Sequence, residues 1–282
     1  MAQIELKNVN YIYSQGTNNE TKALNDVSLT IGEDEFVAII GHTGSGKSTL
    51  IQLMNGLIKC ASGEVLIDGK NIDDKDFNKI ELRKKVGIVF QNPEDQLFEE
   101  TVLKDVCFGP KNLGLSEEEA EKKAIEALEL VGVSKDIYHK SVFELSGGQK
   151  RRVAIAGVLA MEPEILILDE PTCGLDPKGR NKIMKQIQKL HEEKRITIIW
   201  VSHYMEQVGR YAKRIVVLND GKVLFDDEAK NVFAKSKELE EVGLKAPQVS
   251  TIMRKLQDAG LDVDASIINI EEAKDSILNA MK

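Results

Sequence analysis

Short runs of consecutive apolar residues recur along the chain and predict strands that are buried on both faces. Such strands lack the polar alternation of a half-exposed strand and are typical of a parallel sheet. The runs are Phe36–Ile40 and residues 86–90, 165–168 and 196–201. Helix-like stretches separate them, so the pattern indicates an α/β fold with a parallel sheet covered on both sides. Residues 3–13 and 27–31 alternate instead and predict two further strands.

The pattern becomes helical between residue 91 and about residue 160. Ser116 followed by Glu119 forms a capping-box sequence, which predicts a helix start. Gly132 is the predicted end of this helix. One face of it is apolar, formed by Ala120, Ala124, Ala127, Leu128 and Val131. We therefore expect residues 91–160 to form a helical insertion in the α/β core.

The strand pattern stops after about residue 230. Pro247 predicts a helix start and Gly260 its end. This helix carries an apolar stripe of Val249, Ile252, Met253 and Leu256. A last helix should begin at Asn269. We expect residues 1–230 to form one domain and residues 231–282 a small helical appendage, whose stripes either cover the core or make a dimer contact.

Composition narrows the possible partners of this 282-residue chain. The net charge is −8 and no long Lys/Arg run is present. A nucleic-acid-binding protein would show a basic patch, and a protein bound directly to anionic lipid would show a polybasic cluster. We expect neither nucleic-acid binding nor direct membrane insertion, because the longest apolar runs are too short to cross a bilayer. Any membrane attachment should depend on a protein partner.

The cysteines and the N-terminus indicate the compartment. Cys60, Cys107 and Cys173 are odd in number, far apart and without metal-ligand spacing. The first residues lack the pattern of a signal peptide. Both observations favour a reducing, cytosolic compartment.

A phosphate-binding loop is the first candidate functional element. Between a predicted strand and a predicted helix stand Gly41, His42, Thr43, Gly44, Ser45, Gly46, Lys47 and Ser48, followed by Thr49. Glycines let the backbone wrap closely around a phosphate, and the helix N-terminus presents partial positive charge to it. Lys47 should reach the β and γ phosphates, and the Ser48 hydroxyl should bind Mg²⁺.

Two acids end a buried strand, and a second glycine-containing turn precedes a helix. Asp169 at the strand tip should help to hold Mg²⁺, and Glu170 could polarise an attacking water molecule. Residues 145–149 have the sequence Leu-Ser-Gly-Gly-Gln. Its candidate phosphate-binding residues, at a predicted helix N-terminus, are Ser146, Gly147, Gly148 and Gln149.

These elements together resemble the ATP-binding cassette (ABC) ATPase superfamily. In chain order they are the phosphate loop, Gln91, the LSGGQ motif, Asp169-Glu170, Gly174-Leu175-Asp176 and Ser202-His203. The resemblance implies a P-loop NTPase (RecA-like) core with an antiparallel β subdomain and a helical subdomain. It also implies that two such domains face each other head to tail, with each ATP between the phosphate loop of one and the LSGGQ motif of the other.

The resemblance also implies roles for individual residues. Gln91 is similar to the glutamine that touches Mg²⁺ and water, and His203 to the histidine that contacts the γ phosphate. Asp176 is similar to the residue that bridges the two domains. Tyr13 resembles the aromatic residue that stacks on adenine, and Tyr11 is the alternative.

One segment indicates the subfamily. Residues 90–102, FQNPEDQLFEETV, are similar to energy-coupling factor (ECF) transporter ATP-binding subunits, and residues 149–157 and the short helical C-terminus agree. This resemblance implies an ATPase that energises an importer of vitamins or transition-metal ions from the cytoplasmic face of the membrane. Its partners would be a second ATPase subunit, identical or different, a transmembrane coupling subunit and a small substrate-capture membrane protein. Residues 91–101 would line the groove for the coupling helices.

Other classes fit the sequence less well. The chain has no membrane helices of an exporter, no long coiled coil of a chromosome-maintenance ATPase and no second cassette of a translation factor. No guanine-recognition motif of a GTPase is present, since residues 78–81 read Asn-Lys-Ile-Glu. The alternatives left open are a subunit of another ABC importer, a non-enzymatic regulatory subunit or a soluble ABC ATPase without a transport role.

Overall fold

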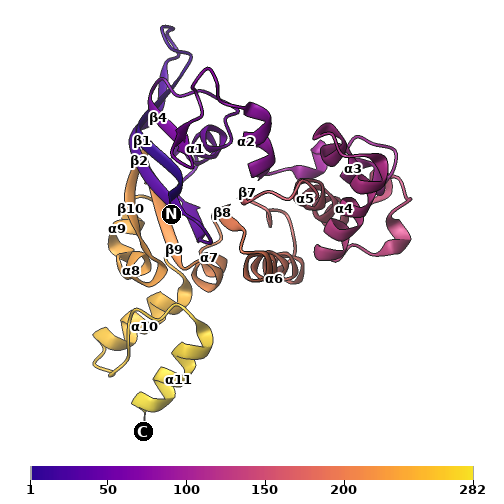
Figure 1. The fold of residues 1–282 in the computed structure, drawn as a ribbon. Helices are drawn as coiled ribbons and strands as arrows, with labels where there is room; N and C mark the ends of the chain where they lie inside the picture. Colours follow the sequence, from indigo (N-terminus) through magenta and orange to yellow (C-terminus); the bar gives the residue numbers. More distant parts are fainter. Residues whose placement is uncertain (1, 282) are drawn as a thin grey trace.

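Two β-sheets form the centre of the protein in this computed structural model, which describes residues 2–281 (Figure 1). The smaller sheet is antiparallel, with strand order β2-β1-β4-β5. Its strands are β1 (Ala2–Tyr13), β2 (Thr21–Gly32), β4 (Ser62–Ile67) and β5 (Lys70–Asn71). β2 begins six residues before the predicted start at residue 27, because the polar residues there pair with β1 across irregular register that no alternation reveals.

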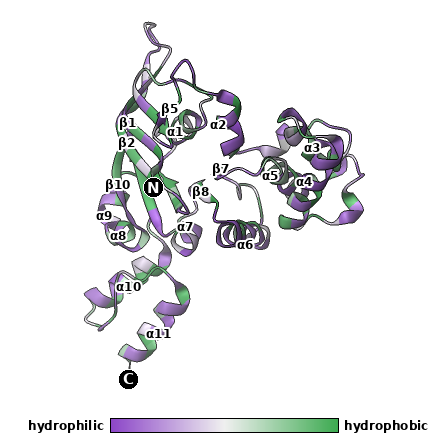
Figure 2. Ribbon diagram, viewed as in Figure 1, coloured by the Kyte–Doolittle hydropathy of each residue, from purple (hydrophilic) through white to green (hydrophobic). Residues whose placement is uncertain are grey.

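The larger sheet has the strand order β10-β9-β3-β8-β7-β6 and is parallel except for the β9–β10 hairpin. Its strands are β3 (Phe36–Ile40), β6 (Val86–Val89), β7 (Ile165–Asp169), β8 (Thr197–Val201), β9 (Arg214–Asn219) and β10 (Lys222–Glu228). Every residue of β3, β7 and β8 is buried. Figure 2 shows apolar residues, in green, on strands of the two sheets. The predicted α/β fold with buried parallel strands is confirmed.

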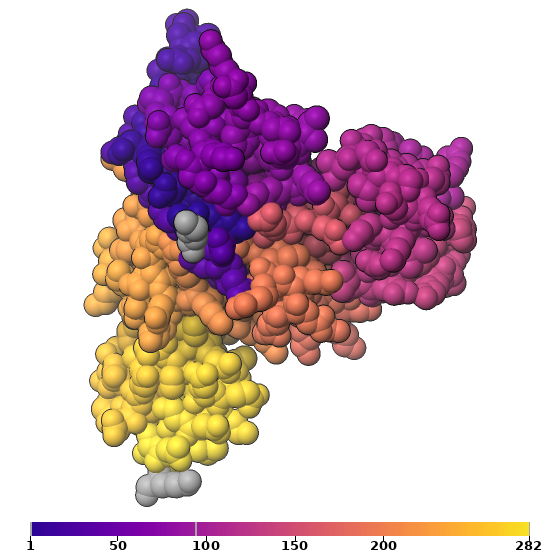
Figure 3. All heavy atoms as spheres, viewed as in Figure 1, coloured from indigo at the N-terminus to yellow at the C-terminus, as the bar shows by residue number. Residues whose placement is uncertain are grey.

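A group of helices forms a lobe at one side of the molecule, magenta in Figure 3. It comprises α3 (Val102–Asn112), α4 (Glu117–Leu130) and α5 (Gly147–Leu159), with 3₁₀ turns at Pro93–Gln96, Lys135–Ile137 and Val142–Glu144. α4 begins with the predicted capping box of Ser116 and Glu119, and its alanine face is buried. Gly132 has a φ of 66° just after the helix, which is the left-handed conformation that ends helices.

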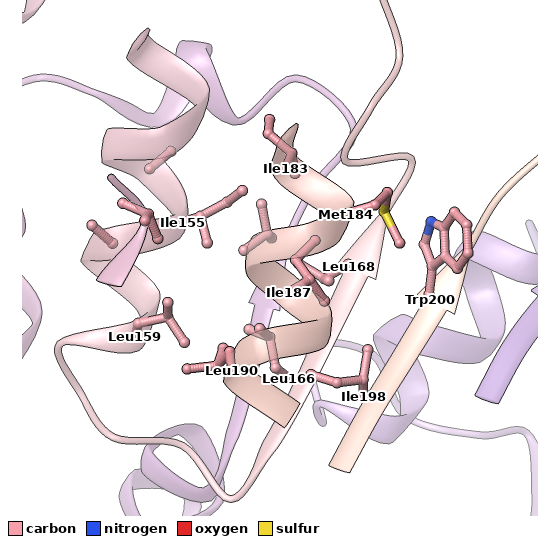
Figure 4. Close-up of a cluster of buried hydrophobic side chains, with 14 of the residues drawn as sticks. Ile155, Leu159, Leu166, Leu168, Ile183, Met184, Ile187, Leu190, Ile198 and Trp200 are labelled. Atoms are coloured by element: carbon pink, nitrogen blue, oxygen red, sulfur yellow. The ribbon is translucent and has the colours of Figure 1, made fainter. Parts of the chain in front are cut away.

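Helix α6 (Pro177–Lys194) connects this lobe to the larger sheet (Figure 4). One stripe of α6 is buried, formed by Ile183, Met184, Ile187 and Leu190. Figure 4 shows α6 between the apolar side chains of α5 and those of β7 and β8, which include the fully buried Trp200. The apolar packing along α6 therefore makes one continuous core of the lobe and the sheet.

Three further helices lie beside the sheets. They are α1 (Lys47–Met54), α2 (Lys79–Lys85) and α7 (Met205–Tyr211). α1 and α7 follow β3 and β8, respectively, so both start at the same edge of the larger sheet. Within residues 2–281, none of the helices combines the length and apolar composition needed to cross a bilayer.

The C-terminal helices divide into two groups by packing. α8 (Ala229–Ala234) and α9 (Ser236–Glu241) pack into the main core, where Val232, Phe233 and Leu239 are 0% exposed. α10 (Gln248–Asp258) and α11 (Ile270–Ala280) form a small core of their own around Met253, Val263 and Ala273, and they protrude from the molecule (Figure 3).

The apolar stripes of α10 and α11 thus pack chiefly on each other, and Ile252 of the predicted stripe is 52% exposed. The C-terminal unit touches the cassette at α7, where the Gln248 N–H donates to Glu206 Oε1 and Pro247 packs on Gly209. It also touches α9, where Arg254 Nη1 donates to Ser236 Oγ. The boundary at residue 230 and a dimer contact in the appendage stay predictions.

This division predicts two different outcomes for two deletions. Deleting residues 247–282 should change the melting temperature of the cassette by less than about 3 °C. The deletion removes the small core around Met253 as a whole and leaves the main core intact. Deleting residues 231–282 should lower it by about 10 °C or more, because three fully buried apolar side chains are lost, each contributing about 2–5 kcal/mol. Circular dichroism melts of both variants measure the difference, and equal losses would contradict the division.

Candidate nucleotide-binding site

The carboxyl edge of the parallel sheet collects the residues that the sequence singled out. Ile39, Val201 and Asp169 lie in one register row across β3, β8 and β7. The loops that leave these strands therefore begin side by side, as in other open α/β sheets that bind ligands at this edge. Val89 of β6 pairs with Leu168, so Gln91 also follows a strand that ends at this edge, although its side chain is exposed.

The loop after β3 requires glycine at two close backbone approaches. A Cβ at Gly41 would lie 2.4 Å from the carbonyl oxygen of Leu218, and a Cβ at Gly46 would lie 2.5 Å from that of Ala23. Gly46 also has a φ of 102°, which side chains rarely adopt. It is the N-cap of α1, and no side chain caps that helix. The N–H groups of the first turn are thus left for an anionic ligand.

Lys47 lies across this loop. Its Nζ donates to the carbonyl oxygens of Gly41 and His42, both at 2.8 Å, and to Ser45 Oγ at 3.4 Å. Burial lowers the pKa of Lys47, while the Glu170 and Asp169 carboxylates oppose this shift. The ammonium group is therefore held at the centre of the loop that should surround the phosphates.

Ser48 and Asp169 bring two oxygen ligands together from α1 and β7. The Ser48 hydroxyl donates to Asp169 Oδ2 at 3.4 Å. Burial and then the neighbouring Glu170 carboxylate raise the pKa of Asp169 to about 6. One hydroxyl and one carboxylate fit Mg²⁺, which usually keeps few protein ligands and takes the rest of its shell from phosphate and water. Among residues 2–281 no cluster of three His, Cys, Asp or Glu side chains offers an all-protein metal site.

Glu170 and His203 form a direct pair from two adjacent strands. His203 Nδ1 lies 2.7 Å from Glu170 Oε1. Glu170 Oε2 is buried and has no hydrogen-bond partner within the described chain. The backbone of Glu170 has a φ of 52°, a strained conformation for a non-glycine residue, and its N–H donates to the carbonyl of Val201. The second carboxylate oxygen is thus available to accept a proton.

Tyr13 lies against the phosphate loop. Its hydroxyl is 3.0 Å from Thr49 Oγ1 and the residue is 42% exposed. Tyr11 contacts Tyr13 edge to face and packs against the core of the smaller sheet. The position and exposure of Tyr13 make it the better of the two candidates for adenine stacking.

The LSGGQ motif lies apart from the phosphate loop, at the start of α5 in the helical lobe (Figure 1). Ser146 is the N-cap of α5 and forms a capping box with Gln149. Gly147 and Gly148 follow on the first turn. The exposed Asp176 is likewise the N-cap of α6, where its Oδ1 accepts from the N–H of Gly179 at 2.6 Å.

Sequence reasoning missed two residues next to His203. The ring of Tyr204 lies 4.2 Å from the imidazole of His203, and the guanidinium of Arg180 lies 4.5 Å from the ring centroid of Tyr204. An aromatic residue directly after the histidine was the available signal, but its contact with Arg180 on α6 could not be obtained from sequence spacing.

The strand-edge phosphate loop, the acid pair, the histidine and the separate signature motif define a P-loop nucleoside triphosphatase of the ATP-binding-cassette class. The sequence model of the ABC transporter family matches residues 24–173. Among curated proteins, the chain is 55% identical over 276 residues to the energy-coupling factor transporter ATP-binding protein EcfA2 of Clostridium tetani, covering 98% of this chain and 96% of the relative. It is 52% identical over 279 residues to the EcfA2 protein of Caldanaerobacter subterraneus, covering 99% and 98%.

Solved structures agree with these relatives. The cbiO1 protein of Clostridium perfringens, described as part of the ABC transporter complex cbiONQ, is 42% identical with a TM-score of 0.76 over 90% of this chain and 99% of that one. The cassette MJ0796, in a dimeric post-hydrolysis state with ADP and phosphate, is 38% identical with a TM-score of 0.71 over 80% and 98%. The chain belongs to the ABC transporter family of ATPases, among the energy-coupling factor transporter ATP-binding proteins, and it binds and hydrolyses ATP.

The raised pKa of Asp169 predicts that Asp169→Asn stabilises the protein at neutral pH while abolishing turnover. In the folded protein the carboxyl binds a proton up to about pH 6, against 3.8 for its ordinary value. Its contribution to stability is therefore complete below pH 3.8 and lost as the pH rises through 6. The shift corresponds to about 2–3 kcal/mol at pH 7.5.

Urea unfolding without nucleotide measures this effect. The variant should be more stable than the parent at pH 7.5, and the gap should narrow at pH 4.5. Asp227→Asn is the matched control, because hydrogen bonds from Asn231 and the N–H of Glu228 lower the pKa of that partly buried carboxyl. A less stable Asp169→Asn variant at pH 7.5 would contradict the prediction.

Proposed function

We propose that this chain hydrolyses ATP held between its own phosphate loop and the signature motif of a second cassette, and that the resulting movement energises an ECF-type importer. The observation that carries the proposal is the Glu170–His203 pair beside the phosphate loop, with one carboxylate oxygen buried and without a partner in the described residues. The names of the relatives, energy-coupling factor transporter ATP-binding proteins, support the transport role.

The phosphate loop binds the nucleotide. The uncapped N–H groups at the start of α1 donate to the phosphate oxygens, and Lys47 exchanges its carbonyl partners for the β and γ phosphates. Tyr13 stacks on the adenine beside Thr49. The remaining loop contacts come from Gly41, His42, Thr43, Gly44, Ser45 and Gly46.

Magnesium fits beside the γ phosphate. Ser48 and Asp169 are the residues that would hold it, with Gln91 as a further ligand from the neighbouring strand end. Bound there, the ion would neutralise charge on the β and γ phosphate oxygens.

Glu170 is the proposed base of the hydrolytic step. Its Oε2 accepts a proton from a water molecule as the water oxygen bonds to the γ phosphorus. The bond from that phosphorus to the β–γ bridging oxygen breaks, and the products are ADP and phosphate. His203 hydrogen-bonds to the γ phosphate and positions Glu170 through Oε1.

A second cassette completes the site. The motif of this chain lies in the helical lobe, away from its own phosphate loop, so its donors would serve the nucleotide of a partner. The donors are Ser146, Gly147, Gly148 and Gln149, and Asp176 bridges the two cassettes. The relative MJ0796 was solved as a dimer, which supports this arrangement.

An aromatic pair on the lobe is the proposed contact for the transmembrane coupling subunit. Phe98 and Phe108 pack edge to face with ring centroids 4.8 Å apart, and they are 56% and 43% exposed. Asp105 accepts from the N–H groups of Phe98 and Glu99, which fixes the turn that presents Phe98. Rigid exposed aromatic residues are typical of protein interfaces. Phe98 belongs to the 91–101 segment expected to meet the coupling helices, and Phe108 on α3 packs against it.

This contact would place the chain at the cytoplasmic face of the membrane as a peripheral subunit. A membrane protein that captures a vitamin or a transition-metal ion would complete the importer. The relative cbiO1 is described as part of a transporter complex, which supports an assembly of this kind.

Glu170→Gln should bind ATP, form a stable cassette pair and lose turnover by about 10²-fold or more, because the amide cannot accept the water proton. Phosphate release and sedimentation with Mg-ATP measure the two effects. Lys47→Ala is the comparison variant, and it should lose nucleotide affinity and therefore pairing as well. Parental turnover by Glu170→Gln would show that another group is the base.

Replacing Phe98 and Phe108 together by serine should abolish association with the membrane complex without lowering nucleotide affinity. Co-purification from detergent extracts and nucleotide titration of the isolated chain are the two measurements. Ile80→Ser on α2 is the control, since Ile80 is also exposed, at 65%, and lies outside the lobe. Unchanged co-purification of the double variant would exclude the aromatic pair as the docking contact.

A further inference from the structure

Few contacts restrict the orientation of the His203 imidazole. The side chain is 50% exposed, and its hydrogen bond to Glu170 Oε1 involves one ring nitrogen. A half-exposed side chain with a single hydrogen bond exchanges between rotamers unless packing restricts it. A catalytic contact of this kind loses rate with small displacements, so the orientation of the ring matters.

Tyr204 supplies packing on the imidazole. The two ring centroids are 4.2 Å apart with an angle of 35° between the planes. Tyr204 itself is fixed at the start of α7, where its N–H donates to Ser202 Oγ and its carbonyl accepts from the N–H groups of Gln207 and Val208. The Tyr204 ring is therefore a fixed surface on which the imidazole of His203 packs.

Arg180 also packs on the Tyr204 ring. Its guanidinium carbon lies 4.5 Å from the centroid of the Tyr204 ring, within the range of a cation–π contact. Its Nε is buried and has no hydrogen-bond partner among residues 2–281. Burial of a donor without an acceptor is unfavourable, and the contact with the ring offsets part of that cost.

We infer that Arg180 and Tyr204 are positioning residues for hydrolysis, which act by holding His203 in register with Glu170 and the γ phosphate. The inference rests on the proposed role of His203. Arg180 stands one turn after Asp176, and its N–H donates to the Asp176 carbonyl. Because Asp176 is the proposed bridge to the second cassette, the stack also connects the approach of the partner to the orientation of His203.

A second contact joins the loop before α6 to α7. Thr172 Oγ1 donates to Gln207 Oε1 on α7 at 3.1 Å, so the loop between β7 and α6 is attached to α7 independently of the stack. Loss of Arg180 should therefore loosen His203 without detaching α7.

Steady-state hydrolysis of ATP by the full-length chain tests the inference. Arg180→Gln and Tyr204→Leu should lower kcat roughly five- to thirtyfold, the loss expected for a cation–π and ring contact, and leave KM within about twofold. Tyr204→Phe keeps the ring and should restore turnover to near the parental value. Melting temperatures recorded in parallel separate loss of positioning from loss of folding.

The decisive comparison places Arg180→Gln in a His203→Ala background. If Arg180 acts through His203, the second substitution should change kcat by less than about twofold there. Arg210→Gln is the matched control, because the guanidinium of Arg210 lies over the ring of Tyr211 in α7, 5.5 Å from its centroid, whereas that of Arg180 lies over Tyr204. It should keep the parental kcat.

The outcomes separate the inference from the proposed function. A slow His203→Ala variant combined with parental Arg180→Gln and Tyr204→Leu variants would overturn the inference alone. A full additional loss in the His203→Ala background would also overturn it, because Arg180 would then act elsewhere. Parental turnover by His203→Ala would overturn the proposed role of His203 itself.

Discussion

The register of the parallel strands is the constraint on which the rest of the structure depends. Because Ile39, Val201 and Asp169 share one row, the three loops that follow emerge together at one edge. A shift of two residues in β8 would move His203 by nearly 7 Å, beyond reach of Glu170. The buried apolar side chains of β3, β7 and β8 oppose such a shift, since one face of the sheet shares a core with the helices of the lobe and α6, and the other shares a core with α1 and the smaller sheet. Core packing thus determines catalytic geometry.

Charge at this edge is held at a cost to stability. Two adjacent carboxylates and one ammonium group are buried where water cannot solvate them fully, and the pKa values of Asp169 and Lys47 shift toward the neutral forms. Glu170 adds a strained backbone conformation. Unfavourable features of this kind concentrate at functional sites, where they prepare groups for a charged ligand. A nucleotide and its metal ion would supply the missing opposite charges. Ligand binding should therefore reduce the electrostatic cost of burying these groups.

The sequence predicted those features that are encoded locally. The buried strands, the phosphate loop, the capping box at Ser116 and the order of the motifs all depend on neighbouring residues, and the structure contains each of them. The contact of Arg180 with Tyr204 joins residues 24 positions apart and depends on how α6 packs on the sheet. The early start of β2 depends on pairing with β1, and the separate core of α10 and α11 depends on which surfaces meet. None of these has a local signal.

Two of the proposed nucleotide-binding groups already make hydrogen bonds within the chain itself. Ser146 makes both halves of a capping box with Gln149, and the Lys47 ammonium donates to two loop carbonyls. Contact with phosphate therefore swaps existing hydrogen bonds for stronger charge-assisted ones, and the net gain per group is small compared with the gross interaction. A two-cassette clamp assembled by such exchanges would therefore close with only a small change in free energy. On this proposal, loss of one phosphoryl group would be enough to reopen the clamp, and the cycle would need no further energy input to reset.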